Sequence, residues 1–243
     1  MGEHTGALLD GSEEELMKLI TSANIACGYH AGDTSTMEAT VRLAVKYNVG
    51  IGAHPGYPDR TNFGRISMIL SPAEVTRLVY EQIQSLGRIA QTQHCEIVHV
   101  KPHGALYDDA ARDPVMAEAI ASGAAQWSKD LILVGLAGSI MLKVWRESGF
   151  HIAPEAFADR VYEPEGTLRS RKFNDAVITD PTIAAHQVLN IVKWGTVLTS
   201  AGTELNIKAT TVCVHSGTPG TILIAKAVRQ TLEEAGINMR GLK

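Results

Sequence analysis

The sequence predicts an α/β fold built on a parallel sheet, and three observations support that prediction. Short apolar runs alternate with longer segments of helical periodicity, six times along the chain. The apolar runs are nearly continuous, which is typical of parallel strands covered on both faces. The chain has 243 residues, a length common among one-domain α/β barrels. We therefore expect a single β/α-barrel domain over residues 1–243.

Each expected strand is a short apolar run that ends near a turn. The six runs are "ANIAC" (23–27), "VGIGAH" (49–54), "EIVHV" (96–100), "LILVGL" (131–136), "HIAPEAF" (151–157) and "TTVCVH" (210–215). Residues 196–208 break this rhythm, because their side chains alternate about an Ala-Gly pair. That alternation predicts a small β-hairpin beside the strand and helix repeats.

The helical segments carry start signals. In residues 71–93, apolar side chains recur at spacings of three and four. Ser71 offers a capping oxygen, Pro72 suits the first helical position and Glu74 completes a capping box. Asp followed by Pro opens two more apolar-periodic segments, at 113 and 180. Further helices are expected at 34–47, 139–148 and 218–236.

Composition excludes several classes of protein. The formal net charge is −4 and the 22 Lys and Arg residues are scattered, which argues against binding to nucleic acid or a membrane surface and favours a small-molecule substrate. Three cysteines without a close pair argue against a disulfide framework and against a Cys-based zinc site. The N-terminal stretch is polar and acidic, so we expect neither a signal peptide nor a membrane span, and a cytoplasmic location.

The carboxyl ends of the expected strands carry most of the reactive side chains. Ligands bind at these ends in parallel α/β folds. Four histidines lie there, and we expect them to share a pocket: His30, His54, His103 and His215. The same ends also carry Asp33, Asp59, Lys101, Gly138, Ser139, Asp159 and Arg160.

This inventory indicates hydrolysis of an unreactive carbonyl bond. Neutral imidazoles with carboxylates bind divalent metals or act as general acids and bases. Lys101, Arg65 and Arg160 are suited to hold a carboxylate or a phosphate. Tyr107 lies beside one of these turns. Its side chain either packs at the rim of the expected pocket or contacts a polar ligand through its hydroxyl, and the sequence leaves both roles open. No Walker-type or dinucleotide motif marks a nucleotide site.

Several longer segments carry a family resemblance. They are "SANIACGYHAGD", "GIGAHPGYPDRTNFGR", "HVKPHGALY", "VGLAGS", "FADRVYEPEGTLRSR" and "CVHSGTPG". In this order they resemble the LamB/YcsF family, the A subunits of ATP-hydrolysing 5-oxoprolinase, from about residue 12 to about 235. The resemblance implies an incomplete, seven-stranded TIM-like barrel related to glycoside hydrolases and polysaccharide deacetylases. It also implies ATP-dependent opening of 5-oxoproline to L-glutamate, together with partner subunits B and C.

The sequence departs from the family pattern in two places. The family usually begins with a strand of the type "DLNxDxGE", of which Gly2 and Glu3 remain, so we expect the first strand and its acidic residues to be missing. Ser216 and Gly217 stand where the family commonly has Gly and Asp. Both departures remove carboxylates that would bind metal or activate water in related deacetylases.

The resemblance leads to hypotheses for individual residues. His54 or His103 would be the general base, with Asp33 or Asp59 orienting an imidazole or binding metal. Lys101 would neutralise an oxyanion or a phosphate, and Arg160 would pair with the substrate carboxylate. The expected substrate-binding residues are His30, Asp59, Arg65, Tyr107, Arg160 and His215. The metal candidates are His30, His54 and His103.

Two other functions stay open at this stage. One is a divalent-metal-dependent amide hydrolase or deacetylase that needs neither ATP nor partners. The other is a catalytically weak binding or scaffold protein, which the missing acidic residues favour. A shared fold does not choose among the three.

Overall fold

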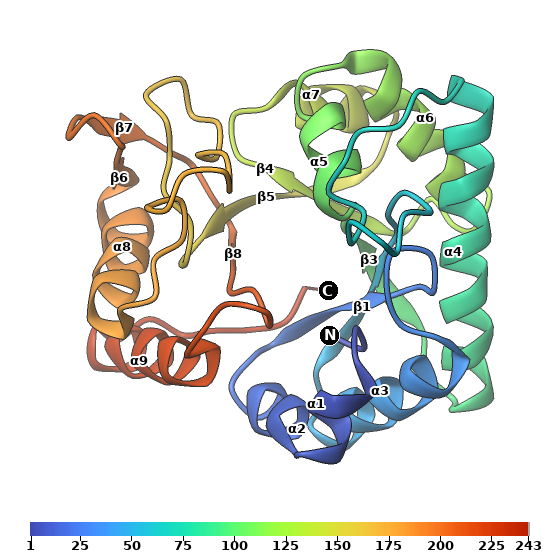
Figure 1. Cartoon of the computed structure of the whole chain (residues 1–243), viewed down its shortest axis with the longest axis horizontal. Coiled ribbons are helices and arrows are strands. Elements are labelled where there is room, and N and C mark those ends of the chain that lie inside the picture. Colours follow the sequence, from blue (N-terminus) through green and yellow to red (C-terminus); the bar gives the residue numbers. More distant parts are fainter. Residues whose placement is uncertain (243) are drawn as a thin grey trace. The chain divides into compact units, whose positions relative to one another are not determined.

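The computed structural model describes residues 1–242, which form two compact units (Figure 1). Unit 1 comprises Met1–Ala153 with residues 241 and 242, and unit 2 comprises Pro154–Arg240. Strand β5 (His151–Phe157) begins in unit 1 and ends in unit 2. The single domain expected over residues 1–243 stays a prediction.

Unit 1 is built on a parallel sheet. Its strands are β1 (Ser22–Ala26), β2 (Gly50–His54), β3 (Ile97–Val100) and β4 (Ile132–Leu136), in that order and each parallel to its neighbour. Ala26 pairs with His54, and Ala53 pairs with Val100. The first three strands therefore end at one edge of the sheet, and the turns that follow them meet there.

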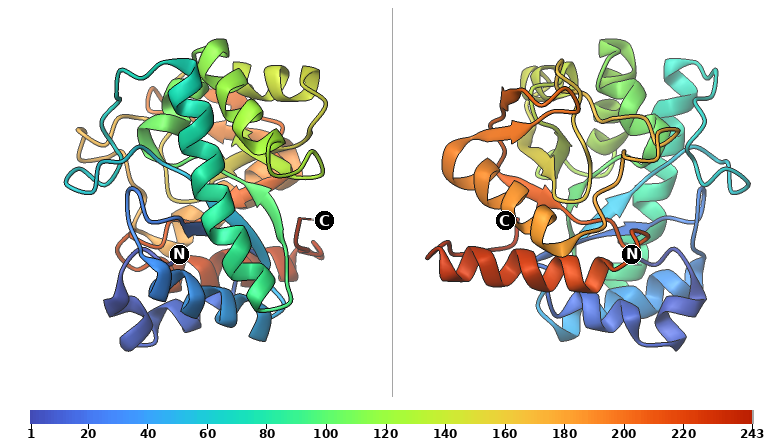
Figure 2. Two further views of the ribbon diagram at one scale, coloured as in Figure 1. Left: turned by 90° about the vertical axis from the view of Figure 1, so that its right-hand side faces the viewer. Right: turned by 60° about the vertical axis from the view of Figure 1, so that its left-hand side comes forward.

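Four predicted helices of unit 1 are confirmed, two of them at the start signals of residues 71 and 113. They are α3 (Thr34–Lys46), α4 (Pro72–Thr92), α6 (Pro114–Ala125) and α7 (Ile140–Glu147), which lie side by side in that order (Figures 1 and 2). The capping box of α4 is confirmed, because Ser71 Oγ accepts from Glu74 N at 3.3 Å and Glu74 Oε2 accepts from Ser71 N at 2.7 Å. Three short helices were not predicted: α1 (Thr5–Leu9), α2 (Ser12–Met17) and α5 (Gly104–Ala110).

The first residues of the chain lie along β1. The Met1 amine donates to Asn24 O at 3.0 Å, and Ala26 N donates to Met1 O at 3.0 Å. Gly2 N donates to the buried carboxylate of Glu13 at 2.7 Å. Met1 therefore satisfies backbone groups of β1 on the side away from β2.

A histidine lies inside the unit 1 sheet. His99 of β3 is buried, and its Nε2 lies 2.9 Å from Asn24 Oδ1. Its Nδ1 has no hydrogen-bond partner among the described residues. Gly52 of β2 provides the space for the ring, because a Cβ at that position would lie 2.0 Å from His99 Nε2. Burial lowers the pKa of His99 to about 3, and the charge of Lys101 adds to that shift.

Unit 2 combines two parallel strands with two helices and a hairpin. β5 pairs in parallel with β8 (Thr211–Cys213). Helices α8 (Pro181–Trp194) and α9 (Thr221–Glu234) pack together through an apolar cluster that includes Val188, Ile224 and Val228. The predicted hairpin is confirmed as antiparallel β6 (Thr196–Leu198) and β7 (Glu204–Asn206). In residues 1–242, no helix combines the length and the apolar character that a membrane crossing requires.

Candidate active site

Three histidines that follow β1, β2 and β3 meet in unit 1. The rings of His30 and His103 are stacked, with centroids 3.8 Å apart and planes 3° from parallel. His54 meets both rings edge-on, at centroid distances of 5.7 and 4.9 Å. Phe63 closes another side and lies edge-on to His30 and His103. We refer to His30, His54 and His103 as the histidine cluster.

Two glycines bring the backbone close to this cluster. A Cβ at Gly56 would lie 2.7 Å from His30 Nδ1, and a Cβ at Gly64 would lie 2.9 Å from His30 Cβ. Gly64 also has φ of +63°, which favours glycine. The side chain of Gln82 on α4 holds the first of these turns, since Gly56 N donates to its Oε1 at 3.0 Å and its Nε2 donates to Gly56 O at 2.9 Å. The two turns that contain Gly56 and Gly64 therefore both pack against the histidine cluster.

Backbone carbonyls determine the tautomers of His54 and His103. His54 Nδ1 lies 2.6 Å from Lys101 O, and His103 Nε2 lies 2.8 Å from Phe63 O. A carbonyl only accepts, so both of these nitrogens carry the hydrogen. The other two nitrogens, His54 Nε2 and His103 Nδ1, face each other at 3.1 Å. In neutral rings both bear lone pairs, so the pair is arranged to take up one proton between them.

Burial keeps two of these imidazoles neutral. It lowers the pKa of His30 to about 2, and the neighbouring charge of His103 acts in the same direction. Burial also lowers the pKa of His54 well below its usual range, again with a contribution from His103. A proton taken up by the facing nitrogens of His54 and His103 is readily given up, because burial disfavours the charged ring. This property suits transfer of the proton to a leaving group.

His30 is the least satisfied member of the histidine cluster. Both of its ring nitrogens are buried and lack a hydrogen-bond partner among the described residues. One ring nitrogen each of His30 and His103 and a carboxylate oxygen of Glu3 lie within 4.8 Å of one another. Imidazole and carboxylate ligands suit divalent metals, so the donor set fits such an ion. One of the stacked rings would have to turn, because a metal–nitrogen bond lies in the plane of the imidazole.

The sequence-predicted metal candidates match this group only in part. His30 and His103 belong to it, while His54 lies beside it and contacts His103. Glu3 was not among the candidates, although it belongs to the family pattern that the N-terminus retains. A preference for strand-end residues therefore missed a candidate ligand near the start of the chain.

Lys101, Tyr107 and Arg65 lie near the histidine cluster. Lys101 is buried, and its ammonium nitrogen lies 5.7 Å from the centroid of the Tyr107 ring. The guanidinium carbon of Arg65 lies 4.9 Å from the centroid of the Phe63 ring. A buried lysine beside neutral imidazoles can stabilise a negative charge that develops in a reaction.

Asp33 and Asp59 have local partners instead. Asp33 caps α3, with its Oδ1 accepting from Thr36 N at 2.9 Å and from Ser35 Oγ at 2.7 Å. Asp59 Oδ1 accepts from the backbone and the side chain of Asn62, at 3.1 and 3.0 Å. Capping hydrogen bonds explain both carboxylates without an imidazole to orient.

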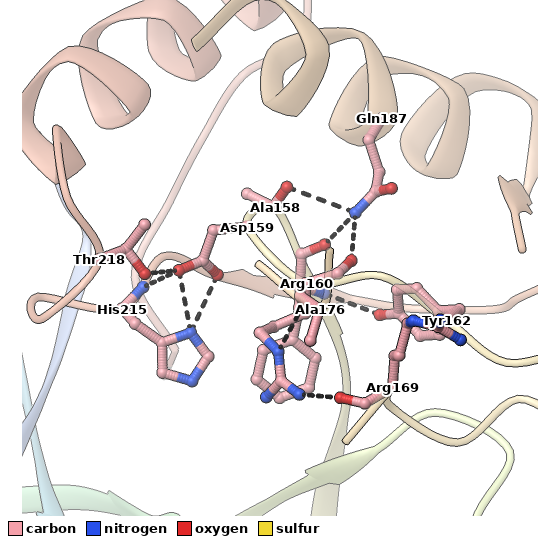
Figure 3. A network of polar contacts seen from close by, with 10 residues as sticks. Ala158, Asp159, Arg160, Tyr162, Arg169, Ala176, Gln187, His215 and Thr218 are labelled. Atoms are coloured by element: carbon pink, nitrogen blue, oxygen red, sulfur yellow. Dashed lines mark hydrogen bonds and ion pairs between the residues drawn. The ribbon is translucent and has the colours of Figure 1, made fainter. Parts of the chain in front are cut away.

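A separate polar network forms in unit 2 around a buried carboxylate, as Figure 3 shows. Asp159 Oδ1 lies 2.9 Å from His215 Nδ1, and Asp159 Oδ2 accepts from His215 N at 3.2 Å and from the Thr218 hydroxyl. The His215 ring is stacked on Phe157, with centroids 5.4 Å apart. An orienting carboxylate therefore exists, but its partner is His215.

Arg160 in the same network is engaged by the backbone. Its Nε donates to Ala176 O at 3.2 Å, and its Nη2 donates to Arg169 O at 2.5 Å. Gln187 Nε2 in turn donates to Arg160 O at 2.9 Å (Figure 3). These hydrogen bonds connect the segment after β5 to residues 169 and 176 and to helix α8. A role for Arg160 in binding a substrate carboxylate stays a prediction.

Known proteins resemble this chain over nearly its full length. The proteins named as the A subunit of 5-oxoprolinase from Chloroflexus aggregans and Pyrococcus furiosus are 48% and 43% identical to it, each over 239 residues. These alignments cover 98% of this chain and 95% and 94% of the relatives.

A solved structure gives the same result. The crystal structure of the lactam utilization protein from Thermus thermophilus superposes with a TM-score of 0.91 at 40% identity, covering 99% of this chain and 96% of that one. This similarity shows the predicted fold class, an α/β fold of the incomplete TIM-like barrel type. The LamB/YcsF family description matches residues 1–243. The chain is therefore a member of the LamB/YcsF family.

Proposed function

We propose that this chain is the A subunit of an ATP-dependent 5-oxoprolinase, which opens 5-oxoproline to L-glutamate. The observation that carries the proposal is the 42–48% identity, over nearly the full length, to proteins that bear the name of that subunit. The name implies partner subunits, and we propose that they are subunits B and C. A cytoplasmic location accords with the use of ATP.

The reaction requires activation and two proton transfers. A five-membered lactam is a stable amide, and transfer of a phosphoryl group from ATP to its carbonyl oxygen would make the carbon electrophilic. Water then attacks that carbon, the ring C–N bond breaks, and phosphate is released in a further hydrolytic step. The attacking water must lose a proton, and the leaving nitrogen must gain one.

The histidine cluster of unit 1 supports the proton transfers. The facing nitrogens of His54 and His103 would take the proton from water and return it to the ring nitrogen. Lys101 would stabilise the negative oxygen or the phosphate. Asp33 and Asp59 are left out of this scheme because their hydrogen bonds are local.

The test is release of phosphate and glutamate from 5-oxoproline and ATP. We expect turnover by this chain together with subunits B and C, and loss of turnover in His54→Gln and His103→Gln. Exposed His151 provides a matched control, since His151→Gln should leave turnover unchanged. Binding of partners and substrate without any turnover would instead identify a scaffold protein.

The group of Glu3, His30 and His103 favours a second candidate, a metal-dependent amide hydrolase. When bound, a divalent ion would supply Lewis-acid polarisation of a carbonyl oxygen. Metal analysis of the purified protein tests this candidate directly. It predicts about one divalent ion per chain, lost in Glu3→Gln and His30→Gln but retained in His99→Gln, whose ring lies outside the group. Metal-free protein that still turns over with ATP would exclude it.

A further inference from the structure

The buried carboxylate of unit 2 has the setting of an acid–base dyad. Asp159 has no exposed surface, and its carboxylate lies beside the His215 ring. A buried carboxylate is costly unless it is paired and hydrogen-bonded. The donors here are the His215 ring, the His215 backbone and the Thr218 hydroxyl. Burial acts to raise the pKa of Asp159, yet the hydrogen bonds from His215 and Thr218 lower it overall, so Asp159 is ionised at neutral pH.

The contacts fix both the tautomer and the plane of His215. An ionised carboxylate only accepts, so His215 Nδ1 carries the hydrogen, and in the neutral ring Nε2 carries the lone pair. Stacking on Phe157, with planes 14° from parallel, defines the orientation of the ring. The side chain of His215 keeps 29% of its surface exposed, in contrast to the wholly buried Asp159. An imidazole held in this way presents one basic nitrogen in a defined direction.

We infer that His215 Nε2 takes the proton from the second water, the one that releases phosphate, and that Asp159 is the residue that positions His215. In that step the water oxygen bonds to the acyl carbon, the bond from that carbon to the phosphate oxygen breaks, and phosphate leaves. The inference deepens the proposed function, because it rests on that function for the identity of the substrate. It involves no group of the histidine cluster, so it can fail without affecting the roles proposed for His54 and His103.

A purely structural reading of Asp159 is the main competitor. In that reading the carboxylate only ties the 215–218 loop to the end of β5, through His215 N and the Thr218 hydroxyl. The two readings differ for Thr218→Val, which removes one tie and keeps the carboxylate beside the ring. A structural tie predicts similar defects in Thr218→Val and Asp159→Asn, whereas a dyad predicts a much larger catalytic defect in Asp159→Asn.

The experiment compares variants of the full chain assembled with its partner subunits. We expect Asp159→Asn and His215→Gln to lower kcat by about ten-thousandfold with little change in KM, as for carboxylates that hold a catalytic histidine. Thr218→Val and the control Asp175→Asn, whose carboxylate pairs with Arg169, should stay within a few-fold of the parent. Activity of His215→Gln near the parent level, or equal losses in Thr218→Val and Asp159→Asn, would overturn the inference.

Nitrogen-15 NMR of the His215 ring tests the positioning itself, because the tautomer depends on the Asp159 carboxylate beside Nδ1 and not on the tie through Thr218. The parent should show hydrogen on Nδ1, and Asp159→Asn should populate the other tautomer while the rest of the spectrum is retained. If the parent complex does not turn over 5-oxoproline, the proposed function fails, and the NMR result alone judges the dyad. Hydrogen on Nε2 in the parent would then refute it.

Discussion

The buried ring of His99 should make the stability of the protein depend on pH. Its pKa is about 3 in the folded chain, against an ordinary value of 6.5. Below pH 6.5 the unfolded chain takes up a proton on His99 that the folded chain does not. The free energy of unfolding therefore falls as the pH falls through this range.

The magnitude follows from the size of the shift. Each pH unit below 6.5 removes about 1.4 kcal/mol, so His99 alone should cost about 2 kcal/mol at pH 5. The other buried histidines with lowered pKa values, His30 and His54, act in the same direction. The contribution of His99 must therefore be isolated by substitution.

Urea unfolding at pH 7 and pH 5, followed by circular dichroism, measures the effect. His99→Gln can keep a donor toward Asn24 Oδ1 without titrating, so its loss of stability between the two pH values should be smaller by about 2 kcal/mol. The exposed-site control His151→Gln should behave like the parent. Equal losses in His99→Gln and the parent would show that His99 does not remain neutral in the folded chain.

Three further predictions concern packing, catalysis and capping. Gly52→Ala should destabilise the protein by about 3 kcal/mol, because its Cβ would lie 2.0 Å from His99 Nε2; adding His99→Ala should relieve part of that loss in a double-mutant cycle. Lys101→Met should abolish turnover at an unchanged melting temperature, and activity at the parent level would remove Lys101 from the mechanism. Ser71→Ala should cost about 1 kcal/mol in urea unfolding, since it breaks the capping box of α4; a change within error would mean that Glu74 alone caps the helix.

Local signals predicted most of the elements. Asp followed by Pro, and the Ser71 capping box, mark helices that tertiary packing preserves. Helix α5 escaped prediction because its first residue is Gly104 at φ of +52° and its N-cap residue, His103, makes no side-chain cap hydrogen bond. The antiparallel hairpin was predictable because its alternation differs from the continuous runs of the parallel strands.

The site was predicted less completely than the fold. The rule that ligands bind at strand ends found the three histidines of the cluster, because parallel pairing aligns those ends. It could not show which aspartate orients a histidine, since that depends on contacts between residues 159 and 215 that are far apart in the sequence. The capping role of Asp33 was predictable from the sequence, because Asp33 stands three residues before Thr36 at the start of a predicted helix.

Gln82 restricts which parts of the site can change over evolution, because it holds the backbone of Gly56. Its amide group mimics a neighbouring strand, because it satisfies both the N–H and the C=O of Gly56 from a helix. The same Nε2 also donates to Leu78 O at 3.1 Å, within its own helix. The turn after β2 therefore takes its position from the interior of α4. Further along the same loop, Phe63 and Gly64 are constrained in turn, because they contact His103 and His30. Change that leaves the proton-transfer groups in place is thus confined to the residues beyond Arg65, where Ile66 and Ile69 are exposed.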